Sequence, residues 1–317
     1  MIADTQSEQD QLAVVPARVP WPAVVGFVVI AAALAWVACL PLWLGPGLTD
    51  PVRLQLCAMG MMFTPLLATV AALIIQRRNR HTTGPSIPRY LGIWPLKPAR
   101  RVIWMIVVAF VGTFLLAVGT LVLAGVVGWA DLDLSGAGLD SLRSASPSMG
   151  SLSNAALAAI SLSAIVPNAL FTAIFAFGEE VGWRGWLLTT LRPLGTWPAL
   201  LITGAIWGLW HAPLILLGYN FARPDLGGLA LMVGGCVAIG ALFGWTRIRT
   251  GSVWPAVAAH GMLNAATPTL IMMTTPPGQA PDGAFVAALG FPGWILIAVI
   301  VAVLIITGQF RRQPELG

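Results

Sequence analysis

Three short segments of an otherwise apolar chain carry side chains that can accept or donate protons. The first contains two adjacent carboxylates and an arginine, the second a tryptophan and a histidine, and the third a histidine and an asparagine: Glu179, Glu180 and Arg184; Trp207 and His211; His260 and Asn264. Carboxylates and imidazoles are common proton-transfer groups in enzymes. A carboxylate, two imidazoles and an amide that meet in one pocket would form a site for acid–base chemistry.

The spacing within each segment places two of its residues on one face of a helix. Residues four apart are neighbours on a helix surface, and three pairs have this spacing: Glu180 with Arg184, Trp207 with His211, and His260 with Asn264. Glu179 is rotated by about 100° from Glu180 and is free to point elsewhere. Taken alone, the Glu180–Arg184 pair is explained as an ion pair at a helix end, and a single histidine as a hydrogen-bonding tie between helices. The combination favours a shared site.

The elements that position these residues must lie in lipid. Of the 317 residues, 57% are apolar and 9% are charged, against roughly 25% charged in a soluble domain. The mean hydropathy is +0.84. This composition excludes a disordered chain, a disulfide-stapled secreted module and an ordinary cytosolic enzyme. The pI of 9.9 reflects basic loops that face an anionic membrane surface, and it does not indicate binding to nucleic acid.

Eight segments are long and apolar enough to cross a bilayer, which takes about 20 residues of helix. They are residues 24–44, 54–76, 102–128, 155–182, 200–218, 227–245, 253–273 and 289–308. Because lipid offers the backbone no hydrogen-bond partners, these spans must be helices. We expect an all-α fold, a polytopic membrane bundle of about eight transmembrane helices over residues 23–308. Residues 134–154, which are rich in Ser and Gly, are expected to form a mobile outer loop.

The basic residues give the orientation of the bundle. Fourteen of the 17 Lys and Arg residues, Arg184 and Arg247 among them, fall in the tails or in loops on one side. The other three are Arg53, Arg143 and Arg223. A basic excess marks the cytoplasmic side. We therefore expect an inner or plasma membrane protein with both termini on the cytoplasmic side. Residues 1–22 and 309–317 would be the cytoplasmic tails.

Read in order, the three polar segments resemble the CPBP family, which comprises the type II CAAX prenyl proteases and the bacteriocin-processing (Abi) intramembrane proteases. The matching pattern is Glu-Glu-x-x-x-Arg, then aromatic-x-x-x-His, then His-x-x-x-Asn, each on a predicted membrane helix. Trp207 is a mild departure, because the second segment of the family usually opens with Phe. The similarity covers about residues 155–273, which we predict to be the catalytic region of the bundle.

The resemblance implies hydrolysis of a peptide bond in a membrane-associated peptide or protein. Glu179 would act as general base on a water that His211 helps to hold. His260 and Asn264 would donate hydrogen bonds to the oxyanion. The supporting residues would be Glu180, Arg184 and Trp207. We expect the four catalytic side chains to share a wet pocket that opens toward the cell interior.

The metal dependence is open at this point. The family is commonly described as metalloproteases, and one Glu with two His is a known zinc ligand set. Zinc held by Glu179, His211 and His260 would leave Glu180 as the base, but the sequence contains no His-Glu-x-x-His pair. We favour a mechanism without metal or other cofactor.

Two other classes of function use the same residues. A transporter or channel would use the carboxylates and histidines as a proton or ion path. A bacteriocin-immunity or scaffold protein would keep the motifs without catalysis. The oligomeric state and the identity of the substrate, including whether it is prenylated, do not follow from the sequence. The three cysteines, Cys39, Cys57 and Cys236, are expected to be inert buried thiols.

Overall fold

The computed structural model describes residues 15–79, 86–145 and 147–311, and within these ranges it contains helices and no strands. The predicted all-α class is confirmed. Most of the expected cytoplasmic tails lies outside the described residues, as do Arg80 and Arg312 from the basic set. The three cysteines are buried and free, as expected.

Each of the eight predicted spans corresponds to helix. The main helices are α2 (Trp21–Trp43), α3 (Pro51–Met62), α4 (Thr64–Arg78), α6 (Ala99–Val126), α8 (Asn154–Glu180), α10 (Thr196–Trp210), α12 (Leu226–Thr250), α13 (Trp254–Thr274) and α15 (Phe291–Ile306). Among the described residues, six stretches are long and apolar enough to cross a membrane. The two spans outside those six are α10, which has only 15 residues, and α13, which carries His260 and Asn264. Two of the three polar segments thus lie on or at the end of the helices with the weaker membrane signal.

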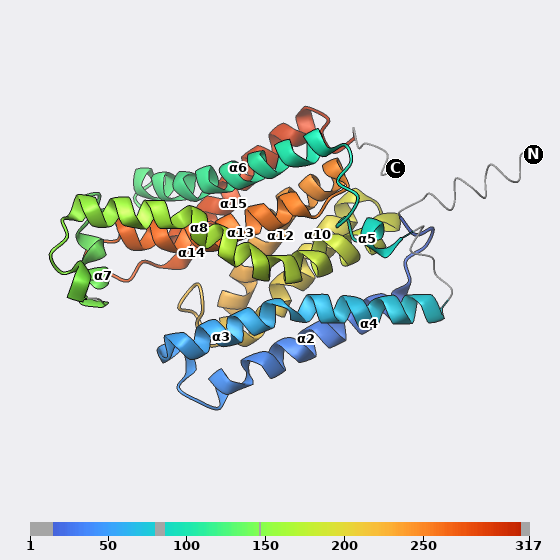
Figure 1. Ribbon diagram of the computed structural model, residues 1–317, viewed down its shortest axis with the longest axis horizontal. Coiled ribbons are helices and arrows are strands. Elements are labelled where there is room, and N and C mark those ends of the chain that lie inside the picture. Colours follow the sequence, from blue (N-terminus) through green and yellow to red (C-terminus); the bar gives the residue numbers. More distant parts are fainter. Residues whose placement is uncertain (1–14, 80–85, 146, 312–317) are drawn as a thin grey trace, which may run out of the picture.

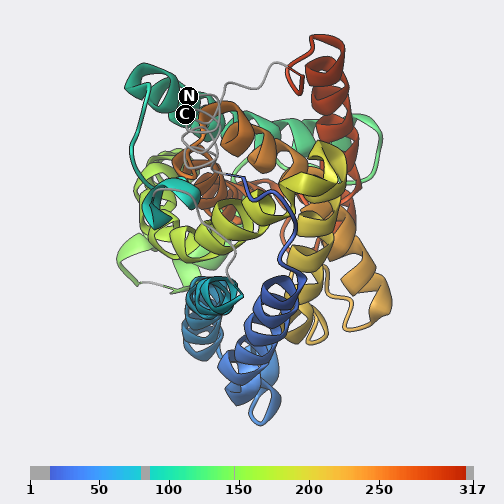
Figure 2. The same cartoon turned by 90° about the vertical axis from the view of Figure 1, so that its right-hand side faces the viewer.

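The helices form one bundle with two distinct ends. In the core, α13 packs against α8 and α6, α10 packs against α12, and α2 packs against α3 and α4. The described chain begins and ends at the same end of the bundle, together with α5 (Ile87–Tyr90) and the start of α6 (Figure 1). Viewed from that end, α2 and α4 form a pair beside the remaining helices (Figure 2). The opposite end carries α7 (Asp140–Ala145).

The Ser- and Gly-rich segment 134–154, expected to be a mobile outer loop, contains short helical elements. It contains η2 (Ala137–Leu139), α7 and η3 (Pro147–Met149). Gly136 allows the turn into η2, because its φ of 81° lies in the left-handed region that favours glycine. Contacts between η2 and α13 fix this segment beside the site helix.

Candidate active site

The first polar segment lies where α8 passes into a π-helical turn, η4 (Val181–Leu187), and then into α9 (Leu188–Leu191). Turns of this type are rare and occur frequently at functional sites. Two glycines let α3 and α4 approach this region closely. A Cβ at Gly182 would lie 2.5 Å from the Pro65 Cβ, and one at Gly178 would lie 2.8 Å from the Met62 carbonyl oxygen. Larger residues at either position would push the carboxylate-bearing turn away from its neighbours.

Glu179 is buried, with 2% of its surface exposed, and its two carboxylate oxygens have different surroundings. Oε2 accepts hydrogen bonds from the indole Nε1 of Trp207 (2.7 Å) and of Trp183 (3.3 Å). Oε1 lies 4.0 Å from Nε2 of His260. Burying a carboxylate is costly unless it is hydrogen-bonded, and the two neutral indoles meet that need on one oxygen. The other oxygen remains directed toward the imidazole.

Glu180 forms the predicted ion pair with Arg184, with Nη1 and Oε1 2.9 Å apart. The same Oε1 accepts a hydrogen bond from Nδ1 of His260 at 2.8 Å. The pair therefore lies inside the bundle and links α8 to α13. The Arg184 guanidinium stacks 4.1 Å above the ring of Trp207, a geometry that favours a cation. Because Nδ1 of His260 donates to Glu180, its Nε2 is a donor only when the ring carries both protons.

His211 lies between the end of α10 at Trp210 and the start of the short α11 (Ala212–Ile215). Its Nδ1 donates to the Trp207 carbonyl oxygen at 2.8 Å, because a carbonyl can only accept. The neutral ring therefore offers Nε2 as an acceptor. Asn264 lies one turn beyond His260 on α13 and is half-buried. Its amide contains two N–H donors as well as an oxygen acceptor.

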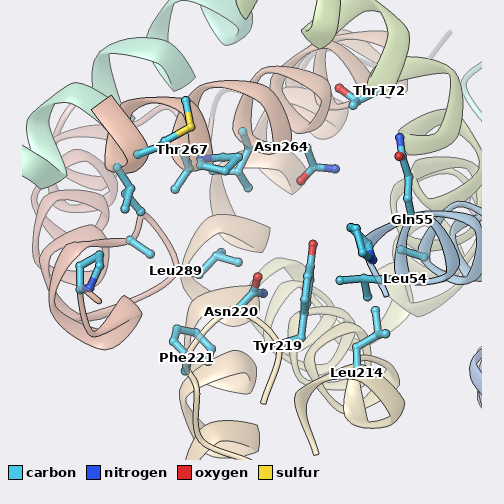
Figure 3. Close-up of a pocket in the computed structure, with 18 of the residues that line it drawn as sticks. Leu54, Gln55, Thr172, Leu214, Tyr219, Asn220, Phe221, Asn264, Thr267 and Leu289 are labelled. Atoms are coloured by element: carbon cyan, nitrogen blue, oxygen red, sulfur yellow. The ribbon is translucent and has the colours of Figure 1, made fainter. Parts of the chain in front are cut away.

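The three segments meet in one cavity of about 960 Å³, which is lined by Glu179, Trp207, His211, His260 and Asn264. Glu180 and Arg184 lie behind its wall. Figure 3 shows residues from several elements around this space, including Asn264 from α13, Gln55 from α3 and Tyr219 from the turn after α11. The structure thus brings together the four residues predicted to be catalytic.

The mouth of the cavity contradicts the expected opening toward the cell interior. It is formed by Gln55, Asp140, and residues 276–279 in the loop after α13. These positions belong to the side that the charge pattern assigns to the exterior. Two sequence-based placements also need correction, because Arg184 and Arg247 are buried, with 1% and 2% of their surfaces exposed, and do not lie in cytoplasmic loops.

Arg247 on α12 closes the bundle behind the site. Its Nη2 donates to the Tyr90 carbonyl oxygen (3.0 Å) and to Thr189 Oγ1 (3.2 Å), and its Nε donates to the Arg184 carbonyl oxygen (3.2 Å). The Tyr90 hydroxyl shares a 2.7 Å hydrogen bond with Thr190. Burial raises the pKa of the Tyr90 phenol, so this group stays protonated. These contacts anchor α5 against α9 and the π-helical turn.

Sequence reasoning missed Trp183 and Arg247. Trp183 follows Glu179 by four residues, so helical spacing alone could have paired them. Arg247 carries no such local signal, because its partners are 58 to 157 residues away in the sequence.

The donor atoms do not form a zinc site. Within the described ranges, no group of three or more His, Cys, Asp or Glu side chains is arranged to hold a metal ion. Nδ1 of His260 contacts Glu180 and Nδ1 of His211 contacts the Trp207 carbonyl, which leaves Nε2 as the one nitrogen of each ring without these contacts. Glu179 uses one oxygen for two indoles. We therefore derive no step through a metal.

Comparison with known families agrees with this geometry. Residues 159–266 match the family described as Rce1-like, type II CAAX prenyl endopeptidase. This region of the chain is similar to that family. The match spans all seven residues of the three motifs, and together with the apolar helices it indicates a multi-pass membrane protein. No curated protein sequence matches the chain.

Proposed function

We propose that this protein is an intramembrane endopeptidase in which Glu179 activates a water molecule for attack on a peptide bond of a membrane-associated polypeptide. The observation that carries the proposal is the pairing of Glu179 Oε1 with His260 Nε2, 4.0 Å apart in the wall of the cavity. A water between these atoms reaches both. The Rce1-like match over the same residues supports the reaction class.

In the proposed reaction, Glu179 Oε1 takes a proton from the water as the water oxygen attacks the carbonyl carbon. His211 accepts a hydrogen bond from that water through Nε2. The carbonyl oxygen becomes an oxyanion that receives hydrogen bonds from the Asn264 amide and from doubly protonated His260. When the tetrahedral intermediate collapses, the C–N bond breaks and the proton on Glu179 passes to the leaving amine.

In this mechanism Trp207, Glu180 and Arg184 do not touch the substrate. They position the side chains of Glu179 and His260. Trp207 holds Oε2 of Glu179, so that Oε1 faces the water. Glu180 fixes the ring of His260 through Nδ1, and Arg184 neutralises Glu180. Orienting contacts of this kind matter because a displacement of about 1 Å in a catalytic group can lower a rate by about 100-fold.

The test compares protein termini in membranes from cells that make the wild-type chain or the Glu179→Gln variant. Glutamine keeps an oxygen for the two indoles but cannot act as a base. We expect peptides with new N-termini in the wild-type membranes and their loss by about 10²–10⁴-fold in the variant. Asp131→Asn, which changes an exposed loop carboxylate, is the matched control and should retain them.

Identical termini from wild-type and Glu179→Gln membranes would refute the protease. Proton or ion flux through proteoliposomes of the wild-type chain, abolished by the same substitution, would favour the transporter instead.

A further inference from the structure

The two ends of the bundle differ strongly in charge. Exposed basic residues gather at the end where the described chain begins and ends: Arg18, Arg77, Arg78, Lys97, Arg100, Arg101 and Arg311. At the opposite end, each of the three arginines pairs with an aspartate: Arg53 with Asp50, Arg143 with Asp140, and Arg223 with Asp282. Because the aspartates offset the arginines at the opposite end, the two ends differ more in net charge than in the number of basic residues. By the positive-inside rule this end is cytoplasmic.

The cavity opens at the other end. Its deepest residues are nearly inaccessible, with Glu179 and Trp207 2% exposed and His260 4% exposed. The residues of its mouth are exposed, among them Gln55, Asp140 and Gln279. Accessibility therefore rises from the catalytic groups toward the end opposite the basic residues.

The cytoplasmic side of the site is closed by packed side chains. Trp183 and Trp186 have no exposed surface, and Trp186 donates to buried Gln76 at 3.2 Å. Behind them, Arg247 ties α5 to the π-helical turn through the Tyr90 carbonyl. A polypeptide entering from the cytoplasm would have to displace this layer and its hydrogen bonds.

From these observations we infer that the cavity takes its substrate from the non-cytoplasmic face of the membrane. The substrate class is an exported or extracytoplasmic polypeptide segment that lies beside an apolar anchor. This inference rests on the proposed function, because it names the substrate of the same site.

The lining indicates what the segment contains. Among the described residues of the wall, most are apolar, including Met59, Met62, Phe175, Leu263 and Ile271, and no Lys or Arg is present. Methionines adapt their shape to varied apolar partners. A carboxylate close to the cleaved bond would find no Lys or Arg in the wall to pair with, and it would face Glu179. The site therefore suits a bond inside a chain, among apolar residues, rather than one next to a free C-terminus.

Cysteine labelling tests the side of access independently of activity. Gln279→Cys places a thiol at the mouth of the cavity, and Asn79→Cys places one at the exposed basic end. The wild-type chain is the background control, because its three cysteines are buried. Intact cells are treated with a small, charged, membrane-impermeant maleimide and compared with lysed cells. We expect Gln279→Cys to be labelled in intact cells and Asn79→Cys only after lysis.

The reverse labelling pattern would overturn the inference, whatever the activity. If the labelling is as expected, the new protein termini that depend on Glu179 should fall in non-cytoplasmic segments of the cleaved proteins. New termini found only in cytoplasmic segments would also overturn the inference. The absence of any Glu179-dependent terminus, combined with the expected labelling, would instead overturn the proposed protease function.

Discussion

Replacing Trp207 with Phe tests whether the indole holds the carboxylate of Glu179. The substitution keeps an aromatic face beneath the Arg184 guanidinium and removes the 2.7 Å hydrogen bond to Glu179 Oε2. Only the longer bond from Trp183, at 3.3 Å, then remains on this oxygen. We expect a less stable protein and a carboxylate that samples more orientations.

The magnitude follows from the charge of the acceptor. A hydrogen bond to a charged group contributes about 1.5–3 kcal/mol, and one between neutral groups about 0.5–1.5 kcal/mol. In a Glu179→Gln background the same indole donates to a neutral amide oxygen. Trp207→Phe should therefore cost about 1–1.5 kcal/mol less there than in the wild type, and this difference is the coupling free energy between the two residues.

The assay is reversible unfolding in mixed detergent micelles for the wild type, both single variants and the double variant. Trp210→Phe is the matched control, because Trp210 lies on the same helix and donates to the neutral Thr64 hydroxyl at 3.0 Å. It loses the same ring volume, but its cost should not depend on Glu179. On cleavage, Trp207→Phe should lower kcat by about 5–10-fold, equivalent to 1–1.5 kcal/mol, with little change in KM.

A coupling free energy below about 0.3 kcal/mol, within the error of additivity, would refute the hydrogen-bond argument. Equal coupling of Trp207 and Trp210 to Glu179 would show that ring volume, and not the indole N–H, stabilises the carboxylate.

Further predictions concern the oxyanion, the ion pair, the closing layer and the metal. Asn264→Leu should lower kcat/KM by about 10²–10³-fold in a cleavage assay, because an oxyanion donor is lost; an unchanged value would remove Asn264 from the mechanism. Glu180→Gln should destabilise the protein by about 3–5 kcal/mol because it leaves Arg184 buried without a counter-charge, and adding Arg184→Met should restore most of the unfolding free energy. Arg247→Met should lower the unfolding free energy by about 1–3 kcal/mol for each buried acceptor left unpaired, measured in the same micelles. A chelator should leave cleavage intact, with metal content well below one ion per chain by elemental analysis; stoichiometric zinc and full loss of activity would contradict this.

Local spacing predicted the parts of the site that lie within one helix. The Glu180–Arg184 pair and the grouping of His260 with Asn264 both depend only on the helical period, so both could be predicted from the spacing of these residues in the sequence. The eight helical spans were also predictable, because the lipid-facing composition leaves the backbone no alternative. Their ends were less so, since α8 continues through η4 and α9 well beyond the predicted end at residue 182.

Contacts between distant segments were not predictable in this way. Glu180 and His260 are 80 residues apart, and nothing in either segment indicates that Nδ1 of the imidazole faces Glu180 rather than Glu179. Arg247 follows an apolar stretch at a helix end, a position typical of a solvated cation, yet its acceptors are backbone carbonyls brought in by α5 and the π-helical turn. The opening of the cavity depends on how α3, α7 and the loop after α13 pack together, and no local sequence pattern indicates this packing.

The charges of the site show why these distant contacts belong together. Glu179, Glu180 and Arg184 sum to one negative charge, and a doubly protonated His260 brings the buried cluster to neutrality. Neutral clusters are the least costly arrangement of charges removed from water. In the proposed reaction, Glu179 takes a proton from the attacking water, and its negative charge disappears as an equal charge forms on the oxyanion beside His260. The net charge of the pocket is therefore constant through the attack, and the neutral indole of Trp207 can hold Glu179 in both states without altering that balance.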